Sequence, residues 1–232
     1  MCKCRFCCEV FSVAVLSIAS AKGGCGKTTL SIILSTALAQ KGYKVRLLDC
    51  DLNQHASEFG AKSEMQDLTV RPSIDEHNIL AEVRSAESES DLTIIDLPGG
   101  SSTLALKALQ RSNFVLVPCQ ASLPDVRDAF KTIAQIDDAE DLARSSIPRA
   151  LIWSRVLPGF ESRAAKHVRE SVEQQNVPVF RAAMLERAAF REMHITGTSP
   201  VESASASPAA QNVEAIAEEL LEKLSALAEN AR

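Results

Sequence analysis

One short glycine-rich segment carries the residues best suited to chemistry. Residues 23–29 read Gly-Gly-Cys-Gly-Lys-Thr-Thr and follow an apolar run. Small residues let backbone N–H groups approach the oxygens of a polyphosphate, and the start of a helix adds partial positive charge. Lys27 is placed to bridge the β- and γ-phosphates, the Thr28 hydroxyl to bind Mg²⁺, and Thr29 to reach the α-phosphate. The segment therefore predicts a site for ATP and Mg²⁺.

The match to the general phosphate-loop pattern G-x-x-x-x-G-K-[ST] is incomplete, because Ala21 stands where the first glycine is expected. The order of apolar strand, loop and helix still favours a phosphate loop. A second lysine, Lys22, stands directly before the glycines. The expected nucleotide contacts are Lys22, Gly23, Gly24, Cys25, Gly26, Lys27, Thr28 and Thr29.

Carboxylates follow two of the predicted strands. Asp49 and Asp51 come after the apolar residues 44–48, and Asp96 comes after the apolar residues 92–95. The carboxyl ends of parallel strands are the edge where such sheets bind ligands. Single aspartates at these positions are often helix caps. Three of them beside a phosphate loop favour a metal–nucleotide site.

The elements that must position these residues are predicted from hydrophobic periodicity. Apolar runs without alternation, separated by helices, are typical of an α/β fold: a doubly wound, mostly parallel sheet with helices on both faces. Strands are expected at residues 13–19, 44–48, 67–71, 92–95, 114–118, 150–153 and 177–180. Helices are expected at residues 28–40, 75–86, 104–111, 125–144, 162–175, 186–194 and 211–229. Residues 203–210 are rich in Ser, Ala and Pro and are expected to form a loop.

Residues 22–29, with a lysine on each side of the glycines, resemble the deviant Walker A motif of the ParA/MinD family of dimeric P-loop ATPases. Residues 49–54 are similar to that family's second motif, D-x-D-P, although Leu52 stands in place of the proline. Residues 96–100 resemble its Walker B and switch segment. Residues 117–125, and 185–190 with Gly197, resemble later segments. The resemblance covers residues 13–200 and is closest to short plasmid-type ParA proteins.

The resemblance implies a role for each of these residues. Lys22 would cross a dimer interface to the partner's nucleotide and act like an arginine finger supplied in trans. Asp51 would position or activate the attacking water, while Asp49 and Asp96 would support Mg²⁺ through water. The catalytic set would be Lys22, Lys27 and Asp51, with Thr28, Asp49 and Asp96 around the metal. The adenine pocket would include Ser154 and Arg155.

The function implied by the resemblance is ATP hydrolysis in DNA partitioning. ATP would close a sandwich homodimer that binds DNA without reading its sequence. A ParB-like centromere-binding adaptor would stimulate hydrolysis and release the DNA, in the cytoplasm at the nucleoid. Two alternatives stay open: a ParA-like ATPase that positions or transfers another cargo, and a nucleotide-gated dimerisation scaffold without significant hydrolysis.

The charge distribution limits where DNA could bind. The 232-residue chain has a net charge of −5, so any DNA contact must come from a local basic patch. Residues 144–191 hold nine basic and four acidic residues. Within them Arg163, Lys166 and Arg169 recur at helical spacing, which predicts either a DNA-binding stripe or an ordinary solvated helix face.

Composition and the chain ends exclude several classes. No apolar run reaches the roughly 18–20 residues that span a bilayer, and 4% aromatic residues argue against stacking platforms for single-stranded nucleic acid. Seven cysteines, four of them within residues 1–8, are not a secreted disulfide framework. Residues 1–12 are expected to be a disordered extension, with a metal or lipid site as the alternative, before a single domain at 13–232. The acidic face of helix 211–229 favours docking on the sheet or a partner over a membrane.

Overall fold

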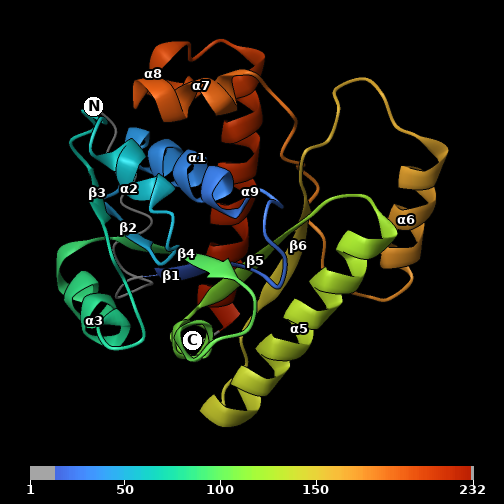
Figure 1. The fold of residues 1–232 in the computed structure, drawn as a ribbon, viewed down its shortest axis with the longest axis horizontal. Helices are drawn as coiled ribbons and strands as arrows, with labels where there is room; N and C mark the ends of the chain where they lie inside the picture. Colours follow the sequence, from blue (N-terminus) through green and yellow to red (C-terminus); the bar gives the residue numbers. More distant parts are fainter. Residues whose placement is uncertain (1–13, 231–232) are drawn as a thin grey trace.

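A parallel β-sheet forms the centre of the molecule (Figure 1). The computed structural model describes residues 14–230. The strand order is β3-β2-β4-β1-β5-β6, and every neighbouring pair is parallel. The strands are β1 (Ala14–Ser20), β2 (Val45–Asp49), β3 (Leu68–Arg71), β4 (Leu92–Gly99), β5 (Phe114–Cys119) and β6 (Arg149–Trp153). The predicted α/β fold is confirmed.

Helices cover both faces of this sheet, so its central strands are buried on both sides. One layer holds α1 (Lys27–Gln40), α2 (His55–Gly60), α7 (Ala189–Thr196), α8 (Pro200–Ser203) and α9 (Pro208–Asn230). The other layer holds α3 (Ile79–Glu89), α4 (Thr103–Leu109), α5 (Leu123–Ala143) and α6 (Arg163–Glu173). Successive residues of β1 face opposite layers: Leu16 and Ile18 enter the first core, and Val15 enters the second.

The predicted strand at residues 177–180 is wrong. Only Val179 forms a bridge, with Leu151 of β6. The segment still bonds to the sheet edge, because Leu151 N–H donates to Pro178 O and Phe180 N–H donates to Leu151 O, each at 2.8 Å. Pro178 has no N–H to donate, so the segment does not extend into a ladder.

Helices α3 and α7 begin later than predicted, and before α3 a side chain bonds to the local backbone. At residues 75–78 the Asp75 carboxylate accepts from the N–H groups of His77 (2.8 Å) and Asn78 (3.0 Å), which makes a turn, and α3 begins only at Ile79. The helix expected at 186–194 begins at Ala189 as α7.

The expected loop at residues 203–210 is partly helical. The short helix α8 ends at Ser203, and α9 begins at Pro208 rather than at residue 211. Ser207 Oγ accepts from Ala210 N–H at 3.1 Å, and proline is well suited to a first helical turn, so α9 starts earlier than its apolar periodicity indicates. The expected extension at residues 1–12 lies outside the described residues. Among residues 14–230, no helix combines the length and hydropathy needed to cross a membrane.

Candidate active site

The glycine-rich loop connects β1 to α1 and is shaped by two left-handed glycines. Gly24 has a φ of 77° and Gly26, the N-cap of α1, a φ of 98°, a region that side chains with a Cβ rarely adopt. The Lys27 side chain folds back over the loop, where its Nζ donates to Lys22 O at 3.1 Å. Lys27 is 6% exposed. The loop therefore holds a buried ammonium group beside the N-terminus of a helix, as a phosphate site requires.

Two other segments close on this loop. Gly99, the last residue of β4, lies so close to the loop that a Cβ added to it would be 3.2 Å from Gly23 N. Met184 approaches Gly26 even more closely, since a Cβ added at Gly26 would be 2.6 Å from Met184 Cε. The Gly99 contact brings the predicted switch segment to the loop. The contact between Met184 and Gly26 could not be predicted from residue spacing, because it depends on how residues 181–187 fold back past β6.

Asp96 lies in β4 opposite Asp49 of β2, beneath the start of α1. Its Oδ1 accepts from Ser31 Oγ at 3.1 Å, while Oδ2 is buried without a hydrogen bond of ordinary geometry to any residue in the described range 14–230. Burial raises the pKa of this carboxyl to about 7; Asp49 adds to the rise, and the Thr28 and Ser31 hydroxyls and Lys27 oppose it. A buried, unsatisfied carboxylate oxygen near a threonine hydroxyl and a phosphate loop fits Mg²⁺ and a nucleotide.

The pKa of Asp96 predicts how stability depends on pH. Because the folded-state pKa is raised from 3.8 to about 7, the folded state keeps a proton that the unfolded state has lost between those values. The free energy of unfolding should therefore fall as pH rises through that window, by up to about 4 kcal/mol from this group. In Asp96→Asn the free energy of unfolding should not fall over this pH window, and at pH 8 it should exceed that of the wild type. Urea unfolding at pH 5 and pH 8 with a chelator measures both; equal pH slopes for the two proteins would contradict the assignment.

The segment after β2 holds Asp51 in a fixed turn. Asp49 accepts at Oδ2 from Ser57 N–H (2.8 Å) and Ser57 Oγ (2.7 Å), and at Oδ1 from Asp51 N–H (3.1 Å). Asp51 Oδ1 in turn accepts from the N–H and the Nδ2 of Asn53, both at 2.9 Å. Asp49 thus ties helix α2 and the Asp51 turn to the sheet. The sequence indicated Asp49 and Asp51, but neither Ser57 nor the short helix that carries it.

Lys22 forms an ion pair within its own chain. Its Nζ lies 2.9 Å from Asp125 Oδ1, in the first turn of α5, and this hydrogen bond raises the pKa of Lys22. The second oxygen of Asp125 accepts from Ser122 Oγ. Farther along the same helix, Thr132 Oγ1 accepts from Ala21 N–H at 2.8 Å. Helix α5 therefore contacts the glycine-rich loop at Ala21 and Lys22. If Lys22 acts on the nucleotide of another subunit, as the resemblance implies, it first has to leave Asp125.

Removing this ion pair should favour assembly. In Asp125→Asn the Lys22 ammonium is released without a change in side-chain size, so nucleotide-dependent dimerisation should occur at a lower protein concentration. The dimerisation constant should improve by no more than about 25-fold, because each of the two subunits releases one partly exposed ion pair that contributes about 1 kcal/mol or less. Sedimentation with a non-hydrolysable ATP analogue measures it, with Asp67→Asn as the control. A dimerisation constant that is unchanged, or weaker, would contradict this role of Asp125.

Ser154 and Arg155 follow β6 at the same edge of the sheet as the loop. Ser154 is 1% exposed, its N–H donates to Cys119 O at 2.9 Å, and its Oγ has no hydrogen bond within residues 14–230. Arg155 is exposed, with a φ of 52°. Val156 N–H donates to Met184 O at 3.2 Å, which joins this turn to the segment that packs on Gly26. Their role in an adenine pocket stays a prediction.

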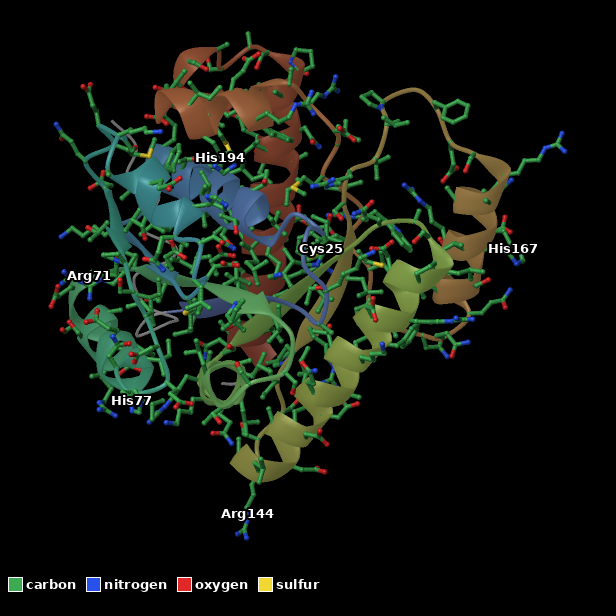
Figure 2. The ribbon with its side chains drawn as sticks, viewed as in Figure 1. Cys25, Arg71, His77, Arg144, His167 and His194 are labelled. Carbon is green, nitrogen blue, oxygen red and sulfur yellow. The ribbon has the colours of Figure 1, made fainter. Side chains whose placement is uncertain are left out.

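About half of the basic residues counted in the sequence form ion pairs in the fold. Arg169 lies 5.3 Å from the centre of the Trp153 ring and 3.1 Å from Glu161. Lys166 makes only a long, exposed contact of 3.9 Å with Glu170, and Arg163 is exposed. Helix α6 stands out to the side of the molecule, with His167 at its outer surface (Figure 2). Other pairs are Arg149 with Asp137 and Glu140, Arg181 with Glu219 and Glu222, and Arg191 with Glu186.

A family model described as VirC1 protein matches residues 13–231. The chain belongs to the VirC1 family. Protein ParA of Rhizobium radiobacter is 26% identical over 90% of this chain and 97% of its own length. Maintenance of carboxysome distribution protein A of Halothiobacillus neapolitanus is 27% identical over 79% of this chain and 85% of its own length.

Among solved structures, the septum site-determining protein MinD of Pyrococcus horikoshii, complexed with Mg-ADP, superposes with a TM-score of 0.74. It is 22% identical, over 92% of this chain and 98% of that chain. This VirC1-family chain is thus a ParA/MinD-type P-loop protein, and the family predicted from its two lysines is confirmed.

Proposed function

We propose that this chain is a Mg²⁺-dependent ATPase that partitions DNA. The observation that carries the proposal is the meeting of four groups at one sheet edge: the buried Lys27 ammonium, the unsatisfied Asp96 oxygen, the fixed Asp51 turn and Lys22. Two cations and two carboxylates around a glycine-rich loop suit phosphoryl transfer to water.

Each side chain has a distinct task in this proposal. The loop N–H groups and Lys27 bind the phosphates, while Thr28 and Asp96 hold the metal. Bound Mg²⁺ supplies charge that offsets the negative charge on the phosphate oxygens. Asp51, oriented by Asn53, directs a water molecule and accepts its proton. Lys22 completes the site of a second subunit, so turnover stays slow until two chains meet.

Binding of the ATP-bound dimer to DNA is the part of the proposal that concerns partitioning. Arg163 and Lys166 are exposed cations of α6, and Lys166 makes only a long contact with Glu170, whereas Arg169 packs on Trp153. Exchange of both for glutamate should weaken ATP-dependent DNA retention at least about tenfold and make its salt dependence shallower. Arg84→Glu with Arg111→Glu changes the net charge equally at exposed positions elsewhere, in α3 and in the turn after α4, and should have a small effect. Equal losses in the two double variants would contradict a DNA-binding stripe on α6.

One alternative has an observation in its favour. The relative named for carboxysome distribution covers most of this chain, which favours an ATPase that positions a cargo other than partitioned DNA. In that case ATP-dependent DNA binding could persist while no centromere-binding protein raises turnover. A third reading, a dimerisation scaffold, predicts ATP-dependent dimers without phosphate release. Phosphate release measured with ATP, DNA and a candidate adaptor, added singly and together, separates the three.

A further inference from the structure

Residues 181–187 form an irregular segment that lies against the glycine-rich loop. Met184, in the middle of this segment, is 3% exposed, and its Cε is the atom that a Cβ built at Gly26 would meet. The Met184 side chain therefore fills the space beside the residue at which α1 begins. Because packed interiors leave few voids, a shift of this segment would change the packing on the loop.

The same segment supports the turn that follows β6. Met184 N–H donates to Trp153 O at 2.8 Å, and Val156 N–H donates to Met184 O at 3.2 Å. Glu186 N–H donates to Val156 O at 2.8 Å. Residues 154–155, for which we predict a place in the adenine pocket, lie within this turn. The segment thus contacts both the loop and the turn of the candidate site.

Helix α9 holds the start of this segment through a buried carboxylate. Glu219 Oε1 accepts from Arg181 N–H and Oε2 accepts from Ala182 N–H, both at 2.9 Å. Glu219 is 4% exposed, and the Arg181 and Lys223 side chains each bring a nitrogen to 3.7 Å from Oε1. Burial of a carboxylate is costly unless it is hydrogen-bonded and paired, and here it is both. Two backbone donors require two acceptor oxygens, which a carboxylate offers and an amide does not.

A second polar residue of α9 holds the rest of the segment. Asn212 precedes Glu219 by seven residues, so the two side chains lie on the same face of the helix. Asn212 Oδ1 accepts from Leu185 N–H at 2.9 Å, and its Nδ2 donates to Ala183 O at 2.8 Å. The residues on both sides of Met184 are therefore bonded to α9.

Helix α9 also packs on α1, the helix that begins at Lys27 (Figure 1). One helix thus contacts both the body of α1 and the segment that packs on its N-cap, Gly26. If residues 181–187 were loose, nucleotide binding at the loop would have to order them. The affinity for the nucleotide would then be lower by the cost of that ordering.

We infer that Glu219 and Asn212 of α9 are positioning residues for the nucleotide site. They hold residues 181–187 in place, so that Met184 packs on Gly26 before a nucleotide binds. The inference rests on the proposed function, because it requires that the glycine-rich loop binds ATP. The apolar periodicity of α9 indicates a docking face, whereas these two polar residues connect the helix to the site.

Glu219→Leu tests this role, because it removes both acceptor oxygens at a similar side-chain size. The affinity for ATP should fall about tenfold, since binding then has to order residues 181–187. The kcat at saturating ATP should stay within about twofold of the wild type, because the proposed catalytic residues are unchanged. Glu219→Gln keeps one acceptor oxygen and should lose less affinity. Asn212→Leu should show the same split between affinity and kcat.

The matched control is Glu140→Leu. Glu140 of α5 also accepts from a loop N–H, that of Ile147, and it pairs with Arg149 at the start of β6, the end of that strand opposite the site. This variant should have a lower free energy of unfolding and a wild-type affinity for ATP. A purely structural role of Glu219 predicts the same result for Glu219→Leu, and that result would overturn the inference.

Two further measurements test whether α9 acts through Met184. The methyl resonance of Met184 in the nucleotide-free protein should move in Glu219→Leu and stay in place in Glu140→Leu. Met184→Ala should itself weaken ATP binding, and addition of Glu219→Leu should then cause little further loss, because residues of one network are not additive. Fully additive losses, or an unmoved Met184 resonance, would overturn the inference. Failure of the wild type to bind ATP would overturn the proposed function and this inference together, whereas equal ATP affinity in the wild type and Glu219→Leu would overturn this inference alone.

Discussion

Lys22→Ala should lower ATP turnover by about 10³-fold or more while nucleotide binding stays within a few-fold of the wild type. A cation supplied in trans to the transferring phosphate contributes about 10³–10⁵ to the rate in related chemistry. Nucleotide binding should survive because Lys27, not Lys22, lies folded within the loop. Phosphate release and the affinity for a fluorescent ATP analogue measure the two effects separately. Lys41→Ala, at the far end of α1, is the control.

The position of Lys22 relative to the nucleotide can be tested by mixing two inactive proteins. In a dimer of Lys22→Ala with Asp51→Asn, one site has its own Asp51 and receives Lys22 from the partner, so it is complete. An equal mixture should recover about a quarter of wild-type turnover, because half of the dimers are mixed and each has one complete site. If Lys22 served its own nucleotide, no site in the mixture would be complete. Absence of recovery would therefore contradict a lysine that acts in trans.

Asp51→Asn should lower turnover by about 10²–10⁴-fold, the usual contribution of a positioned general base. The asparagine oxygen can still accept from Asn53, so the turn should keep its shape. The affinity for ATP and the dimerisation constant should therefore change little. Single-turnover hydrolysis is the measurement, and Asp67→Asn, at an exposed carboxylate near β3, is the control. Turnover near the wild-type rate would show that Asp51 only shapes the loop.

Much of the site was predictable because its parts are local in sequence. Residues 22–29 are one loop, and a glycine-rich strand–loop–helix has few ways to fold. Asp49, Asp51 and Asp96 meet because parallel strands bring their carboxyl ends to one edge, which follows from the pattern of apolar runs alone.

Contacts between distant segments were not predictable. Asp125 lies in residues 117–125, which resemble a segment of the ParA/MinD family. Its ion pair with Lys22, however, depends on the angle at which α5 leaves β5. The excess of basic residues in 144–191 suggested a positive surface, yet acids from other segments neutralise Arg149 and Arg181. Residues 177–180 had the composition of a strand, and Pro178 reduced them to an edge contact.

The amino-acid sequence by itself determined the fold class, the phosphate loop and the lysine that marks the ParA/MinD type, because hydrophobic periodicity and a contiguous motif act over a few residues. Only the tertiary structure decided which charges remain free. The pairing of Lys22 with Asp125 and the pairing of Arg181 with Glu219 depend on side chains that lie far apart along the chain. The attraction between two charges weakens within a few ångströms, so pairing depends on distance in space. The positions of charged residues along the sequence do not give that distance.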